Sequence, residues 1–364
     1  MTNDLEYWLR LSCLEGVKNI IKIDLITALG DAKKVYEASK EILLRAGFSK
    51  ENYRSFYSED IRNEALNIID NCTKEKIEIL TITNQEYPEM LKYIPDPPIV
   101  LYVLGNIPKS NCVAIVGSRK ASGYGIETAS KMAFNLAYSD ITIVSGMARG
   151  IDTAAHSGAL EAGGKTVAVL GSGLDVIYPP ENKNLMTRII KSGAVISEYP
   201  PGSPPSTIHF PCRNRIISGM SLGTLVVEAG MKSGSLITAG SALEQGREVF
   251  AIPGNINNYN SVGTNKLIKD GAKMVINVDD ILEELSFGIA PIEKKKKGKR
   301  KKNNHLLSQK EKKIISILKI EDLYDQELSN KTSLELTELF EILLDLELKG
   351  LIKKSINGKF MLIS

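Results

Sequence analysis

The stretch that decides the fold reads Val113-Ala114-Ile115-Val116-Gly117-Ser118-Arg119-Lys120-Ala121-Ser122-Gly123-Tyr124-Gly125. Its four consecutive apolar residues predict a strand that is buried on both faces, as in a parallel sheet. The glycine-rich turn that follows leads into a helical stretch over residues 125–138. A strand, a glycine turn and a helix in this order begin a crossover connection between parallel strands.

The same alternation repeats from about residue 77 to residue 287. Short runs of Val, Ile and Leu alternate with helical stretches such as residues 152–162 and 238–245. This pattern predicts an α/β fold, with an extended Rossmann-like, doubly wound and mostly parallel sheet. The expected strands are residues 100–104, 113–116, 142–144, 167–170, 194–197, 224–227, 249–252 and 274–276.

Glycine-rich turns follow several of these strands, among them Gly117-Ser118-Arg119 and residues 145–152, which include Arg149. In such sheets ligands bind outside the carboxyl ends of the strands, where helix N-termini attract anions. We therefore expect an anion site at this edge. The turns have neither the GxGxxG spacing nor a GxxxxGK[ST] loop, so we expect no cofactor. Asp152 is expected to be a helix N-cap rather than a catalytic acid.

A second group of residues lies between positions 209 and 219, and comprises Phe210, Arg213, Asn214 and Arg215. Guanidinium groups contact phosphates and an aromatic ring stacks on a base, so this group is typical of a site for single-stranded nucleic acid. In the alternative interpretation Phe210 belongs to the core, and one arginine pairs with an internal carboxylate, Glu198 or Glu228. A further loop between a strand and a helix carries Lys232 and Ser233.

Two smaller parts flank the α/β region. Residues 1–76 have helical spacing and predict a helical domain of the SAM or helix-hairpin-helix kind. Its turn at residues 16–19 lacks the second glycine of a DNA-gripping hairpin, so we interpret this domain as structural. Residues 306–364 predict a winged helix. Its third helix, residues 333–349, carries five acidic side chains, which favours a protein-interaction or dimer-stabilising role over reading of DNA.

The positive charge of the chain is concentrated in one short segment. Residues 294–302 carry eight positive charges in nine positions, whereas the whole chain of 364 residues has a net charge of only +3. Residues 288–305 are therefore expected to form a linker that either tethers the last domain or contacts phosphates.

No apolar run is long enough to span a membrane, and the acidic start lacks signal-peptide features. Four widely spaced cysteines predict neither disulfides nor a metal site. We expect a cytoplasmic protein.

The ordered motifs of the central region resemble those of the DNA-processing protein A family, also called Smf. These motifs are residues 87–88, 97–102, 117–119, 145–156, 178–179, 210–218 and 232–239. The resemblance implies a protein of natural transformation that binds single-stranded DNA without catalysis, forms a homodimer and loads the RecA recombinase. It implies a phosphate-binding Arg119, a stacking Phe210 and a further cation at Lys232. Many members carry a lysine where this chain has Thr207, so one phosphate contact is expected to be missing.

A nucleotide-processing hydrolase of the lysine-decarboxylase-like Rossmann group is the alternative function. That group uses a PGGxGTxxE loop, in which the glutamate acts on the ribose. Here three residues separate Thr224 from Glu228, and no Pro-Gly-Gly precedes them. The altered spacing moves the carboxylate to another face of its strand, so the sequence favours a binding protein over an enzyme.

Overall fold

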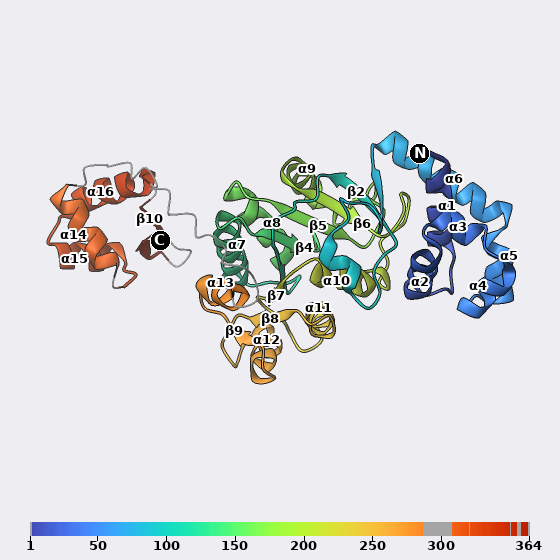
Figure 1. Cartoon of the computed structure of the whole chain (residues 1–364). Coiled ribbons are helices and arrows are strands. Elements are labelled where there is room, and N and C mark those ends of the chain that lie inside the picture. Colours follow the sequence, from blue (N-terminus) through green and yellow to red (C-terminus); the bar gives the residue numbers. More distant parts are fainter. Residues whose placement is uncertain (1, 287–307, 320, 350, 355–357, 363–364) are drawn as a thin grey trace. The chain divides into compact units, whose positions relative to one another are not determined.

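The computed structural model describes residues 2–286, 308–319, 321–349, 351–354 and 358–362. The chain divides into two compact units, Met1–Glu293 and Lys294–Ser364 (Figure 1). The predicted basic run, residues 294–302, lies outside the described residues.

Six helices come first, and polar caps set their ends. Ser39, Ser49 and Ser58 each accept a hydrogen bond from a backbone N–H three residues later, so each begins a helix. Gly30 and Gly47 end helices with φ angles of 108° and 116°, which L side chains rarely adopt. The helices are α1 (Thr2–Cys13), α2 (Asn19–Leu29), α3 (Ala32–Tyr36), α4 (Lys40–Ala46), α5 (Lys50–Phe56) and α6 (Glu59–Glu75).

Nine strands of the described residues form one sheet in the order β1-β2-β6-β5-β4-β3-β7-β8-β9. From β6 to β9 every neighbouring pair is parallel, whereas β2 runs antiparallel to both β6 and β1. This confirms the predicted α/β, mostly parallel sheet. The strands are β1 (Glu78–Thr81), β2 (Val100–Gly105), β3 (Cys112–Val116), β4 (Thr142–Ser145), β5 (Thr166–Leu170), β6 (Ala194–Ser197), β7 (Gly223–Val226), β8 (Glu248–Ala251) and β9 (Lys273–Met274).

The connections wind in two directions from β3. Helices α7, α8 and α9 lead from β3 through β4 and β5 to β6, whereas α10, α11 and α12 lead to β7, β8 and β9 on the other side. Right-handed crossovers place the two sets on opposite faces, and the direction changes between β3 and β7. The helices are α7 (Gly123–Tyr138), α8 (Ile151–Glu161), α9 (Lys183–Ser192), α10 (His209–Gly219), α11 (Gly234–Glu244), α12 (Tyr259–Lys269) and α13 (Asp279–Ser286), with short 3₁₀ turns η1 (Glu89–Tyr93) and η2 (Pro180–Asn182).

Within its described residues, the second unit contains three helices followed by an antiparallel strand pair, in the predicted order. Ile314, Leu328, Leu339 and Leu343 form its core. The winged-helix assignment stays a prediction, and Asn357 of the predicted hairpin turn lies outside the described residues. The elements are α14 (Gln309–Leu318), α15 (Asp325–Thr332), α16 (Leu336–Leu348), β10 (Ile352–Lys354) and β11 (Phe360–Leu362).

Candidate nucleic-acid interface

Four loops meet at the edge formed by the carboxyl ends of the parallel strands. Residues 117–122 follow β3, residues 146–150 follow β4, residue 171 follows β5, and residues 227–233 follow β7. Strands β3 and β7 are neighbours, and the chain winds away from them in opposite directions. A doubly wound sheet binds its ligands at such a reversal point. The predicted site residues therefore lie together because the chain reverses its winding direction between β3 and β7.

The N-terminus of α7 is filled by a carboxylate of the protein itself. Glu228, only 2% exposed, accepts hydrogen bonds from the backbone N–H of Ser122 at 2.9 Å and from its Oγ at 2.5 Å. The backbone carbonyl of Glu228 also accepts from the N–H of Ser118 at 2.7 Å. Helix N-termini bind anions, and here that anion is Glu228. The N–H groups of Ser118 and Ser122 are therefore bound within the protein, and an anion site at this turn stays a prediction.

The loop before α8 is closed in the same way by Asp152. Its buried carboxylate accepts hydrogen bonds from the N–H groups of Gly146 and Ala148 at 3.2 and 3.3 Å. Gly150, with a φ angle of 75°, is the N-cap of α8, so the prediction that Asp152 is the N-cap is wrong. Burial raises the pKa of the Asp152 carboxyl, and the charge of Arg213 acts against that rise.

The guanidinium of Arg213 lies in the protein interior rather than at the surface, contrary to the sequence expectation. The residue is 4% exposed, and Nη1 donates hydrogen bonds to the carbonyl oxygens of Val169 and, at 2.8 Å, Gly146. Burial lowers the pKa of Arg213 to about 10. Nε donates to Oδ1 of Asn214 at 3.2 Å, and the amide of Asn214 donates to the carbonyl of Gly234 at 3.3 Å. Both residues thus tie α10 to the loops around it.

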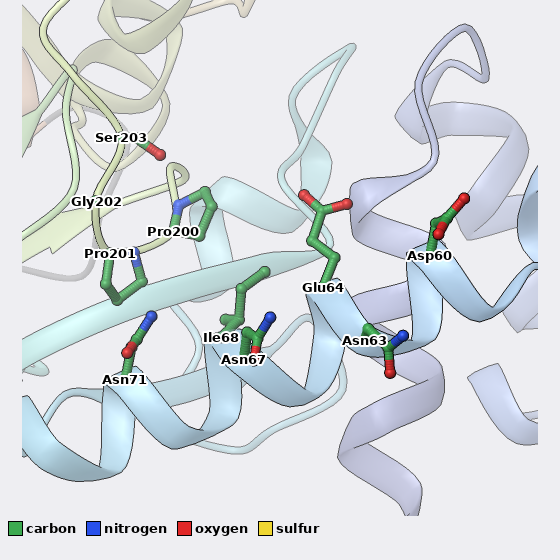
Figure 2. Close-up of a pocket in the computed structure, with 10 residues that line it drawn as sticks. All are labelled: Asp60, Asn63, Glu64, Asn67, Ile68, Asn71, Pro200, Pro201, Gly202 and Ser203. Carbon is green, nitrogen blue, oxygen red and sulfur yellow. The ribbon is translucent and has the colours of Figure 1, made fainter.

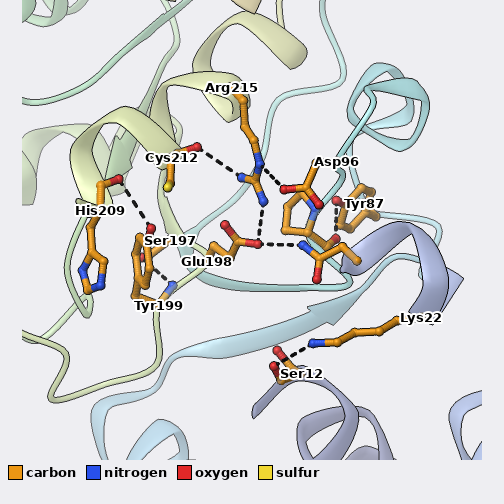
Figure 3. Close-up of polar contacts among 12 residues, drawn as sticks. Ser12, Lys22, Tyr87, Asp96, Ser197, Glu198, Tyr199, His209, Cys212 and Arg215 are labelled. Atoms are coloured by element: carbon orange, nitrogen blue, oxygen red, sulfur yellow. Dashed lines mark hydrogen bonds and ion pairs between the residues drawn. The ribbon is translucent and has the colours of Figure 1, made fainter. Parts of the chain in front are cut away.

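Arg215 pairs with Glu198, a partner that the alternative interpretation named, and also with Asp96. Its guanidinium lies 2.7 Å from Oε1 of Glu198 and 2.9 Å from Oδ2 of Asp96 (Figure 3). The same Glu198 oxygen accepts a hydrogen bond from the amide of Asn19 on α2 at 3.3 Å. Arg215 therefore connects α10 with the first helices of the chain.

An exposed cation and two aromatic rings lie together at the edge. The guanidinium carbon of Arg119 is 5.0 Å from the ring centroid of Phe210, and the Tyr178 ring is 5.7 Å from the same ring. Phe210 is half-buried and Tyr178 is 39% exposed. A Cβ on Gly171 would lie 2.9 Å from the Phe210 ring, so the glycine leaves room for that ring. Tyr178 was quoted as part of a motif, but no pattern in the sequence placed it beside Phe210.

The remaining predicted residues border this group in different ways. Arg149 forms an exposed ion pair with Glu181. Ser233 caps α11, and Lys232 is exposed just before it. Lys120, which the sequence analysis did not select, is an exposed cation next to Arg119. Its only sequence signal was its place in the same turn.

Metal sites and membrane spans are both absent from the described residues. Within them, no group of three or more His, Cys, Asp or Glu side chains is arranged to hold a metal ion. In the same part of the chain no helix is long and apolar enough to cross a membrane.

Comparison with known proteins shows the family of the chain. The family model described as DNA recombination-mediator protein A matches residues 78–286. The DNA processing protein DprA of Streptococcus pneumoniae is 48% identical over 215 residues, which are 58% of this chain and 76% of that protein.

Two solved structures are similar along most of their own length. The X-ray structure of DNA processing protein A from Streptococcus pneumoniae has a TM-score of 0.64 and 38% identity, and the match covers 77% of this chain and 97% of that one. The Helicobacter pylori protein, described for its single-stranded DNA binding mode, has a TM-score of 0.52 and 29% identity, with coverages of 58% and 97%. The chain belongs to the DNA recombination-mediator protein A family.

Proposed function

We propose that this chain binds single-stranded DNA at the carboxyl edge of the sheet. The main support is the exposed guanidinium of Arg119, which lies over the Phe210 ring, and the Tyr178 ring, which packs against the same phenylalanine. In the proposal Arg119, Lys120 and Lys232 contact phosphates, while the Phe210 ring stacks on a base. The single-stranded DNA binding mode described for the Helicobacter pylori relative supports this assignment.

The buried members of the predicted site have a positioning role in this proposal. Glu228 holds the loop after β3 through Ser118 and Ser122, and Asp152 holds the loop after β4 through Gly146. In the proposal a phosphate therefore meets side-chain cations in front of these loops. Arg213, Asn214 and Arg215 fix α10, and with it the Phe210 ring. Ser233 caps α11 behind Lys232, and Arg149 contacts a phosphate only after it leaves Glu181.

The role of the chain follows from its family and from this site. We infer that it protects incoming single-stranded DNA in natural transformation, acts as a homodimer and loads the RecA recombinase. We also infer that binding is not coupled to catalysis. The carboxylate that the hydrolase alternative would need, Glu228, is buried and hydrogen-bonded to Ser122, which supports a structural role for it.

A comparison of single-stranded with duplex DNA tests the proposal. We expect tighter binding to single strands and little dependence on their sequence, because a ring and guanidinium groups accept any base and phosphate. Electrophoretic mobility shifts at two salt concentrations measure this preference. Equal affinity for duplex DNA would contradict the proposed site. Release of free base from nucleoside monophosphates would favour the hydrolase instead.

Replacing Arg119 with alanine should reduce the salt dependence of binding. Each lost phosphate contact lowers the magnitude of the slope of log affinity against log salt by about 0.7 for single strands. Titrations of fluorescent oligothymidine at several salt concentrations give this slope. Lys109→Ala is the matched control, because Lys109 is an exposed cation that precedes β3, at the opposite end of the same strand. If Arg119→Ala binds as tightly as the parent with the same slope, the phosphate assignment is wrong.

A further inference from the structure

A groove of about 540 Å³ lies between helix α6 and residues 200–203, the loop that follows β6 (Figure 2). Helix α6 forms one wall with three asparagines spaced four residues apart, Asn63, Asn67 and Asn71. Asp60 and Glu64 of the same helix also line the groove. The opposite wall consists of two prolines, a glycine and a serine. None of these residues belongs to the DNA site proposed above.

Both walls are fixed by interactions within the protein. On α6 the buried residues Ile61, Ala65, Ile68 and Cys72 recur at helical spacing, so the three asparagines lie on the exposed side of the helix. The N–H of Gly202 donates to both carboxylate oxygens of Asp175 at 2.9 Å, which holds the loop. The groove is therefore formed before any ligand binds.

The spacing of the amides matches an extended peptide. Four residues of an α-helix rise about 6 Å, and two residues of an extended chain advance about 6.6 Å. Each asparagine amide offers both a donor and an acceptor, as a peptide group does. Successive amides of Asn63, Asn67 and Asn71 can thus meet the backbone of every second residue of one strand-like segment. Main-chain hydrogen bonds of this kind provide affinity for extended peptides.

The charge of the groove selects the side chains of that peptide. Asp60 and Glu64 are carboxylates, and the lining contains no lysine or arginine. Such a surface attracts cations and repels the phosphates of a nucleic acid. A peptide whose alternate residues are basic therefore fits, whereas a DNA strand does not.

We propose that this groove binds an extended peptide segment of a partner protein that carries lysine or arginine at alternate positions. The amides of α6 hold its backbone, and Asp60 and Glu64 attract its side chains. The proposal does not depend on single-stranded DNA binding, since the two sites have no residue in common.

Fluorescence polarisation with the full chain tests this proposal. The probe is a fluorescein-labelled peptide of alternating lysine and serine, and the neutral control peptide has glutamine in place of lysine. We expect the lysine peptide to bind and the triple variant Asn63→Ala, Asn67→Ala, Asn71→Ala to weaken its binding at least about tenfold. This variant changes no charge, and alanine favours the helix. Circular dichroism checks that it folds.

Two further measurements separate the groove from general attraction to an acidic surface. Asp60→Asn should weaken peptide binding about threefold at low salt, whereas Glu75→Gln, at the end of α6 outside the groove, should leave it unchanged. Unchanged peptide binding by the folded triple variant would overturn the proposal. It would also be overturned if that variant lost affinity for oligothymidine but not for the peptide, because the groove would then be part of the DNA path.

Discussion

Arg213→Met is expected to lower the free energy of unfolding by about 3–5 kcal/mol, the usual effect of leaving a buried charge without its partner. The guanidinium is fully enclosed and donates to the carbonyls of Gly146 and Val169. Methionine fills a similar volume but leaves both oxygens without this donor and removes the positive charge near Asp152. Urea denaturation followed by circular dichroism measures the loss.

The pH dependence of the stability of Arg213→Met tests whether the unpaired carboxylate of Asp152 causes this loss. Burial raises the pKa of Asp152, and removing the nearby cation raises it further. An acid with a raised pKa binds its proton more tightly in the folded state, so the variant should regain stability as the pH falls towards that pKa. Arg149→Met is the matched control, because its ion pair with Glu181 is exposed and screened by solvent, so its loss should change the free energy of unfolding little. A similar loss in both variants would contradict this account.

Phe210→Ala is expected to weaken binding of single-stranded DNA by about 1–3 kcal/mol, the energy of one stacked base. The slope of log affinity against log salt should stay the same, because a ring releases no counterions. Arg119→Ala should change the slope, so the two variants separate stacking from phosphate contact. Fluorescence titrations with oligothymidine at several salt concentrations measure both quantities.

Stability distinguishes a binding ring from a core ring at this position. A core phenylalanine replaced by alanine costs about 3–5 kcal/mol, whereas the half-buried Phe210 should cost clearly less. Phe134→Ala is the control. Phe134 is also half-buried, but it stacks on Tyr138 at the C-terminal end of α7, whereas the proposed site is at the N-terminal end of this helix. A variant of Phe210 that loses stability but no DNA affinity would show that the ring serves packing alone.

Most of the sheet could be predicted from its apolar runs, because strands buried on both faces carry near-continuous Val, Ile and Leu. Strand β1 escaped prediction because it has only four residues and begins and ends with the polar residues Glu78 and Thr81, which leaves an apolar run of two. Gly30 and Gly47, both with positive φ, end α2 and α4, and a glycine after a helical pattern is a signal that the sequence itself carries.

The candidate site was predicted less completely, because long-range partners decide which polar groups face solvent. Arg119 and Arg213 are the same residue type, yet one is exposed and the other donates to backbone carbonyls from β5 and the loop after β4. Glycine turns indicated free N–H groups, but Glu228 reaches Ser122 from 106 positions along the chain. No local pattern contains that information. Residue chemistry selected Arg119 and Phe210, and the resemblance to the family assigned them the phosphate-binding and stacking roles. Spatial proximity added Lys120 and Tyr178.

The two carboxylates that close the glycine turns affect how a bound strand can leave. Glu228 and Asp152 already hold the N–H groups of Ser122, Gly146 and Ala148, so no loop has to close over a phosphate or open to free it. In the proposed complex each nucleotide is held by solvent-facing side chains, which exchange contacts one at a time. A competing protein can then displace the strand progressively from one end. The rate of DNA dissociation should accordingly rise with the concentration of the competing protein. The residence time of the strand then depends on that protein as well as on the affinity of this chain for DNA.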